Sequence, residues 1–127
     1  MVSDFSGRWL AKLDESVFVS RTPQRLSAEI TQSLDQLHVE MHFSFDGSDD
    51  SRMVFDASIV DGDEVRSGSV ALARWMGSDL VVDMRFESGG EEVALRERWS
   101  LSGDGTRLTM AHKQDVLAGQ TVIFDRQ

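Results

Sequence analysis

Apolar and polar residues alternate along almost the whole chain, and turn-forming dipeptides interrupt the alternation at short intervals. A period of two places successive side chains on opposite faces of a strand, whereas an amphipathic helix needs a period of about 3.6. The pattern therefore predicts antiparallel strands in sequence order, over residues 5–14, 25–33, 36–45, 52–60, 65–76, 79–87, 92–101, 106–113 and 119–126.

Most of the predicted turns contain glycine, which supplies the positive φ angles that tight hairpins require. They are Asp46-Gly47, Asp61-Gly62, Gly77-Ser78, Gly89-Gly90 and Asp104-Gly105. Residues 15–24 differ because they hold the only proline, and we expect a helical turn or a flap over one end there. Strands with one apolar face each must close on themselves or pair as a sandwich. The 127 residues therefore predict a single all-β domain, an up-and-down antiparallel barrel of eight or nine strands spanning 1–127.

Parity within each strand predicts which side chains face the interior. In strand 36–45 one face is wholly apolar, while histidine, glutamate and serine share the other. The same test gives the expected inward residues, which are Leu37, Val39, Met41, Phe43, Phe45, Met53, Phe55, Ala57, Ile59, Leu80, Val82, Met84, Phe86, Val93, Leu95, Glu97, Trp99 and Leu101.

Strand 65–76 has an unusually small inward face. A two-residue turn at Gly77-Ser78 would pair Trp75 with Leu80 and Ala73 with Val82. Small residues opposite large ones predict an internal cavity, or a core plugged by a loop or a helix. The inward residues of this strand are Ser67, Ser69, Ala71, Ala73 and Trp75.

The opposite face of the same hairpin is apolar. It either suits a homodimer contact or consists of scattered surface residues. Its residues are Val70, Leu72, Met76 and Val81.

The composition narrows the possible partners. With 22 acidic against 13 basic residues the formal charge is −9, which disfavours nucleic acid and anionic membranes. Cysteine is absent, so disulfides, thiolate metal sites and thiol catalysis are excluded. No apolar run approaches a membrane span and no signal peptide is visible, so we expect a soluble protein, cytoplasmic as written or exported if the chain is a trimmed precursor. The excess of arginine over lysine and the absence of asparagine suggest a bacterial, GC-rich coding sequence.

Glu97 is the one charged residue on an otherwise apolar inward face. A two-residue turn at Asp104-Gly105 would place it opposite His112, and Trp99 opposite Met110. A carboxylate inside a barrel must be paired, protonated or in contact with water. The pair is interpreted as a structural ion pair, a polar handle for a ligand, or an acid and base in catalysis.

The run HVEMH, residues 38–42, contains common metal ligands. On a strand His38 and His42 lie roughly 13 Å apart, too far for one ion, and both face outward. We therefore expect no metal site, and nothing else in the sequence indicates a cofactor.

Gly7-x-Trp9 on the first strand resembles the opening motif of lipocalins and related calycin barrels. FSGRW, ARWMGSDLVV and RERWSLSGDGTRLTM resemble small bacterial lipocalin-like domains of unassigned function. The resemblance implies that Trp9 closes one end of the barrel under an arginine, for which Arg126 is the match. A second lipocalin motif is missing, and without tyrosine the arginine-tyrosine carboxylate clamp of fatty-acid-binding proteins is incomplete. A fatty-acid ligand is therefore not implied.

Three functional hypotheses remain open. The preferred one is the binding or carrying of a small, mostly apolar molecule inside the barrel. The second is an isomerase, cyclase or hydrolase that uses Glu97 and His112 as acid and base; the third is a non-catalytic, oligomerising interaction domain. The predicted ligand-binding residues are Glu97, His112, Trp75, Trp99, Ser69, Ala71, Ala73, Met84, Phe43 and Phe55, and the predicted barrel-closing residues are Gly7, Trp9 and Arg126.

Overall fold

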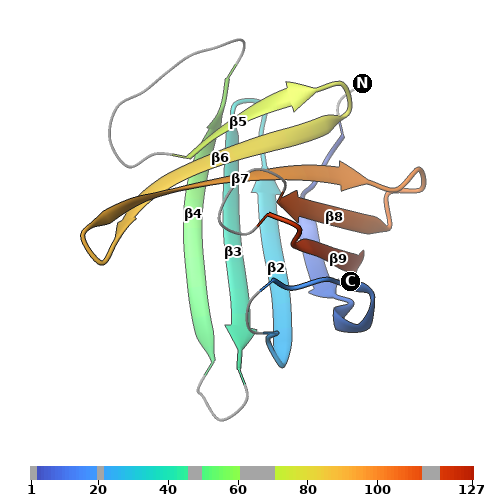
Figure 1. Ribbon diagram of the computed structural model, residues 1–127. Helices are drawn as coiled ribbons and strands as arrows, with labels where there is room; N and C mark the ends of the chain where they lie inside the picture. Colours follow the sequence, from blue (N-terminus) through green and yellow to red (C-terminus); the bar gives the residue numbers. More distant parts are fainter. Residues whose placement is uncertain (1–2, 20–21, 46–49, 61–70, 113–117) are drawn as a thin grey trace.

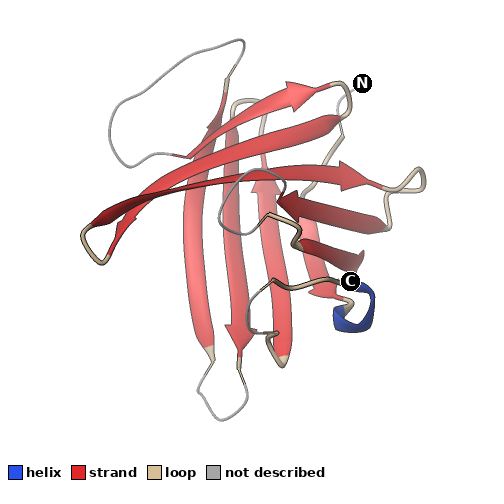
Figure 2. Cartoon of the chain, viewed as in Figure 1, coloured by secondary structure: helices blue, strands red, loops and turns tan. Residues whose placement is uncertain are grey.

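The computed structural model describes residues 3–19, 22–45, 50–60, 71–112 and 118–127, apart from the side chains of residues 86–88. Within this part of the chain the structure is almost entirely β-sheet (Figures 1 and 2). The elements are β1 (Gly7–Ala11), the 3-10 helix η1 (Leu13–Glu15), β2 (Arg25–Gln32), β3 (Gln36–Ser44), β4 (Ser51–Ile59), β5 (Ala71–Met76), β6 (Asp79–Ser88), β7 (Glu91–Leu101), β8 (Arg107–His112) and β9 (Thr121–Arg126).

The nine strands form a closed barrel in sequence order, in which β1 pairs with both β2 and β9. The all-β barrel predicted from the alternation is confirmed. One neighbour pair departs from the expected up-and-down order, because β4 and β5 run parallel and share only Ser58↔Leu72 and Ile59↔Ala73. The predicted turn at Asp61-Gly62 and the first part of strand 65–76 lie outside the described residues, as does the turn at Asp46-Gly47.

Two hairpins have the register that their turns predict. Across Gly77-Ser78, Trp75 pairs with Leu80 and Ala73 with Val82. Across Gly89-Gly90, both glycines have positive φ, 62° and 83°, as a two-residue hairpin turn of type I′ requires.

The turn between β7 and β8 is longer than expected, yet it preserves the predicted pairing. The N–H of Ser102 donates to the carbonyl of Arg107, so the loop consists of residues 103–106 and not of Asp104-Gly105 alone. Lengthening a loop by one residue on each side leaves the register unchanged. Glu97 therefore lies opposite His112, and Trp99 opposite Met110, as the shorter turn predicts.

The segment after β1 begins with a short helical turn. η1 ends the first strand at Ala11, before the predicted limit of residue 14, and Val17 then forms a single bridge with Thr121. Arg107 of β8 bonds Glu15 of η1 at 3.2 Å and Asp125 of β9 at 3.3 Å. These ion pairs hold the helical turn against the barrel wall. None of the described helices is long and apolar enough to cross a bilayer.

One end of the barrel is closed around Trp9, which is 1% exposed. Arg126, directly opposite in the β1–β9 pairing, is itself exposed and places its guanidinium carbon 4.3 Å from the centre of the indole. The guanidinium also donates to the carbonyls of Ser6, Gly105 and Asp4, at 2.6, 3.0 and 3.4 Å. This is the geometry that the resemblance implies for these two residues.

Residue 7 must be glycine for two reasons, its backbone conformation and the lack of room for a side chain. Its φ is +139°, a conformation that residues with a side chain rarely adopt, and an added Cβ would lie 2.6 Å from Nη1 of Arg126. The guanidinium cannot move away without losing its carbonyl bonds and its contact with Trp9.

We therefore expect Gly7→Ala to lower the free energy of unfolding by about 1–3 kcal/mol, measured by urea denaturation. Gly103→Ala is the matched control, because a Cβ there meets nothing within 4 Å and its φ is not in the left-handed region. The control should stay within about 0.5 kcal/mol of the parent. Equal stability of both variants would contradict the account of the closed end.

Asp104 stabilises the β7–β8 turn as a carboxylate. The Ser102 hydroxyl donates to Oδ1 at 2.7 Å, and Thr106 donates its hydroxyl at 2.8 Å and its N–H at 3.2 Å. These bonds lower the pKa of Asp104 from 3.8 to about 2. Because the folded pKa is depressed, this stabilisation is complete above pH 3.8 and is lost as the pH falls through about 2.

A carboxyl-carbon NMR titration should therefore give a pKa for Asp104 near 2, and Ser102→Ala should raise it toward 3.8. Ser100→Ala, two residues earlier and on β7, has no bond to Asp104 among the described residues and should leave the pKa of Asp104 unchanged. A titration midpoint near 3.8 in the parent protein would show that the turn lacks these bonds.

Candidate functional site

An ionisable pair lies inside the barrel, on two neighbouring strands. Glu97 belongs to the middle of β7 and His112 is the last residue of β8. Nε2 of His112 lies 3.1 Å from Oε2 of Glu97, within hydrogen-bond distance. Only 9% of Glu97 and 4% of His112 are exposed, so the predicted contact and its predicted burial are both present.

The surroundings of this pair are apolar. Of the described residues, the buried polar or charged ones are Ser44, Glu97 and His112. Taking a carboxylate and an imidazole out of water has a large desolvation cost. Well-packed apolar residues would serve stability as well or better, so the pair is a candidate for a functional role. Chemically it can accept and donate hydrogen bonds to a ligand and can pass a proton between its members.

On four strands, β3, β4, β6 and β7, the inward side chains are buried at one level and become more exposed toward one end of the strand. On β3, Leu37 and Val39 are fully buried, whereas Met41 and Phe43 are half-buried. On β4, Ala57 is 1% exposed, Phe55 is half-buried and Met53 is 42% exposed. The same change occurs on β6 between Val82 and Met84, and on β7 between Glu97 and Leu95. The inward apolar face thus becomes accessible toward one end, which we call the mouth.

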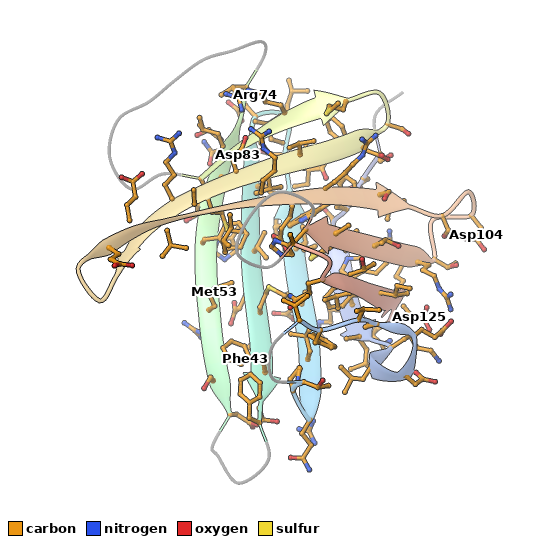
Figure 3. The ribbon with its side chains drawn as sticks, in the orientation of Figure 1. Phe43, Met53, Arg74, Asp83, Asp104 and Asp125 are labelled. Carbon is orange, nitrogen blue, oxygen red and sulfur yellow. The ribbon has the colours of Figure 1, made fainter. Side chains whose placement is uncertain are left out.

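The mouth coincides with the part of β4 that has a strand on one side only. Within the described residues, Ser51–Ala57 pair with β3 but not with β5, which meets β4 only at Ser58 and Ile59. Figure 3 shows Phe43 and Met53 on this lower part of β3 and β4, below the crossing strands β6 and β7. Met53 shares the register of the inward set, as predicted, because it pairs with Met41, but it is 42% exposed. Among the described residues, no strand pairs with this part of β4 on the side away from β3.

The predicted ligand-binding residues fall into two groups. Trp99 and Ala73 lie in the sealed part, each 0% exposed, whereas the others line the half-buried part of the inward face. Those others are Ala71, Trp75, Met84, Phe43 and Phe55, all packed against the core. Ser69 and Ser67 lie outside the described residues, and no observation tests binding by any member of the set.

Phe5 is an interior residue that the sequence interpretation did not single out. It is 0% exposed, stacks on Trp75 with ring centroids 6.1 Å apart, and meets Trp99 edge to face at 5.7 Å. Its carbonyl accepts the indole N–H of Trp9 at 3.0 Å. The parity of residues 5, 7 and 9 contained this signal. Trp75 and Trp99 therefore pack on an aromatic residue of the chain itself.

The proposed outward apolar patch is mostly covered. Leu72 is 7% and Val81 9% exposed, so the expectation of an exposed patch is wrong for these two residues. Met76 is 53% exposed, and Val70 lies outside the described residues. Beside them, Asp83 bonds Arg74 at 3.0 Å and Arg96 at 2.6 Å, and Figure 3 shows Arg74 and Asp83 on this outer side. A homodimer through this face stays an untested prediction.

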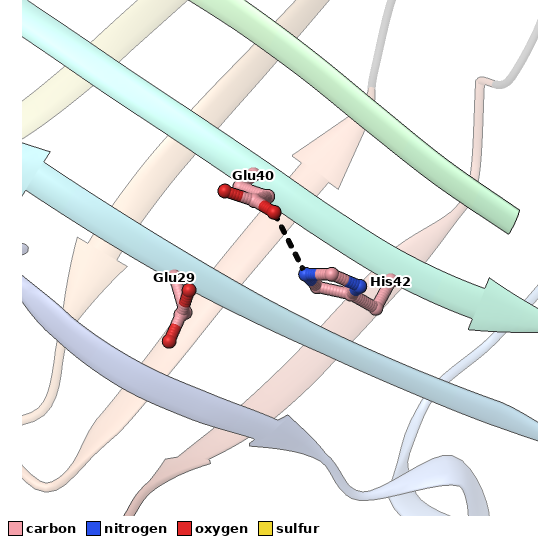
Figure 4. Close-up of side chains that lie close together, drawn as sticks. All are labelled: Glu29, Glu40 and His42. Carbon is pink, nitrogen blue, oxygen red and sulfur yellow. Dashed lines mark ion pairs between the residues drawn. The ribbon is translucent and has the colours of Figure 1, made fainter.

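The histidines of the HVEMH run lie on the outer face, as predicted, and pair with different carboxylates. His38 bonds Asp56 at 2.6 Å, and His42 bonds Glu40 at 3.2 Å. Cross-strand pairing also brings Glu29 close to Glu40 and His42, with ligand atoms within 4.8 Å of one another (Figure 4). The pattern along a single strand does not reveal this trio, because it depends on the pairing of β2 with β3.

Each carboxylate of the trio already has a cationic partner. Arg8 bonds Glu29 at 2.9 Å and Arg52 bonds Glu40 at 3.3 Å. Two glutamates directly opposite each other would repel, and the arginines offset that repulsion without a metal. The trio has metal-ligating residue types, but its contacts are those of a surface ion-pair network.

Comparison with known proteins gives no assignment. No protein-family model matches the chain, and no curated protein matches it. The function has to be argued from the interior pair and its surroundings.

The buried pair should be strongly coupled in its effect on stability. We expect a double-mutant cycle of Glu97→Gln and His112→Ala to give a coupling energy of about 1–3 kcal/mol, because each group otherwise remains buried without its partner. The energetic cost of the cavity left by the imidazole occurs in both variants that carry His112→Ala, so it cancels in the coupling energy.

Asp56→Asn and His38→Ala form the matched control, since that pair has the same chemistry but is 67% and 46% exposed. Its coupling should stay below about 1 kcal/mol. Equal coupling in the two cycles would mean that the interior pair is as well solvated as a surface pair.

Proposed function

We propose that this chain is a lipocalin-like barrel that binds a small, mostly apolar molecule in its interior, with Glu97 and His112 as the polar handle. The observation that carries the proposal is the buried contact of 3.1 Å between these two side chains on an otherwise apolar inward face. A ligand head group that bonds to the pair would find polar groups there in an otherwise apolar interior.

The gradient of burial supports the same function. The pair lies between the sealed layer of Trp99 and Leu80 and the half-buried layer of Leu95 and Met84. A molecule that enters at the mouth would first contact apolar side chains and then reach the pair at its inner end. Binding sites of this kind combine a mainly apolar lining with a few placed polar groups.

A second candidate, acid-base catalysis, uses the same pair. Imidazole and carboxylate at hydrogen-bond distance can transfer a proton to or from a bound molecule, as an isomerase, cyclase or hydrolase requires. Both candidates need an interior that admits a molecule, so binding is the step to test first.

Binding should depend on the inward face of β4 and not on its outward face. We expect N-phenyl-1-naphthylamine, an uncharged fluorescent apolar probe, to bind with a stoichiometry of one. Met53→Asp should weaken binding about tenfold or more, because it places a charge on the apolar mouth. Fluorescence titration measures both affinities.

Val54→Asp is the matched control, since Val54 is the neighbouring residue on the opposite face and is 41% exposed against 42% for Met53. It should bind the probe like the parent. Equal weakening by both substitutions, or no saturable binding by the parent, would contradict a binding site inside the barrel.

A further inference from the structure

The indole N–H of Trp99 has no hydrogen-bond partner within the described part of the chain, although its atom is fully buried. Buried donors are almost always paired, because an unpaired one loses its bond to water and gains nothing in return. Trp9 shows the ordinary situation, since its N–H donates to the carbonyl of Phe5 at 3.0 Å. The edge-to-face contact of Trp99 with Phe5 offers at most an aromatic ring, which is a weak acceptor.

Trp99 lies next to the proposed polar handle. It follows Glu97 by two residues on β7, so both side chains face inward, about 7 Å apart along the strand. Its cross-strand partners, Leu80 and Met110, are apolar and buried. The unpaired donor therefore lies one layer beyond Glu97, on the side away from the mouth.

We infer that the ligand of this barrel carries a neutral carbonyl oxygen that accepts the hydrogen bond of the Trp99 indole. The inference rests on the proposed function, because it requires a molecule in the interior. It adds the chemical class of the ligand: a neutral ketone, ester or amide with an apolar body that extends toward the mouth.

The charges near Trp99 favour a neutral acceptor over a carboxylate. Glu97 would repel an anionic head group from the adjacent layer. Arginine and lysine are absent from the buried residues that the structure describes, so an anion would find no cationic partner there other than His112. An uncharged carbonyl accepts the same hydrogen bond without this repulsion.

Three probes with one bicyclic skeleton test the inference: 1-indanone, indane and indane-1-carboxylate. Each competes with N-phenyl-1-naphthylamine for the parent protein, while the three indole N–H signals are followed by proton-nitrogen NMR. We expect indanone to bind about tenfold more tightly than indane, and the carboxylate to bind most weakly. Only indanone should move the Trp99 signal downfield, and the Trp9 signal serves as an internal control because its N–H is already bonded.

Trp99→Phe assigns the Trp99 signal and removes the donor while keeping an aromatic ring. It should reduce the preference for indanone over indane to less than about threefold. If this variant does not fold, the NMR shift in the parent protein still decides.

The inference is overturned, with the proposed function intact, if N-phenyl-1-naphthylamine binds but indanone shows no preference or leaves the Trp99 signal in place. The same holds if the free protein already shows a bonded Trp99 signal from a resident water that no probe displaces, or if the carboxylate binds best. If N-phenyl-1-naphthylamine itself does not bind, the proposed function and the inference fail together.

Discussion

The contact between Glu97 and His112 depends on a single constraint, the register of the β7–β8 hairpin. A shift of one residue would move Glu97 to the outer face and expose the apolar side chains that flank it. The loop of residues 103–106 holds this register through the Ser102–Arg107 backbone bond and the bonds to the Asp104 carboxylate. This hairpin register places Glu97 opposite His112 and Trp99 opposite Met110 in the buried layer.

The two ends of the barrel have opposite properties. At the closed end, Arg126 covers Trp9 and bonds three carbonyls, and Gly7 leaves the space that this arrangement needs. At the mouth, Ser51–Ala57 of β4 pair with β3 but with no described strand on the other side, and the inward residues Phe43 and Met53 are partly exposed. At one end Trp9 is thus buried, and at the other the inward side chains are partly exposed. The polar pair lies between them.

Local sequence patterns predict most of this arrangement. The alternation of apolar and polar residues and the glycine turns predict the strands and the pairing registers across Gly77-Ser78 and Gly89-Gly90. The Glu97–His112 contact was predictable because a hairpin pairs residues whose separation depends only on the turn. An error in loop length did no harm there, since the two extra residues were added symmetrically.

Features that depend on non-local pairing were not predictable. The parallel pairing of β4 with β5 is not encoded in either strand, and the 42% exposure of Met53 does not follow from its inward parity. The burial of Leu72 and Val81 on the outer side could not be deduced from alternation. Alternation predicts which side of the sheet a residue faces, but not whether other residues pack over that side. Likewise the Glu29, Glu40 and His42 trio needed the β2–β3 register.

The central claim is that the interior beside Glu97, His112 and Trp99 accommodates a molecule other than the chain itself. A high-resolution crystal structure of the protein, purified without added ligand and then soaked with 1-indanone, tests this most directly. The account predicts electron density for the ketone inside the barrel, with its oxygen within hydrogen-bond distance of the Trp99 indole. An interior filled entirely by the chain's own side chains would contradict it.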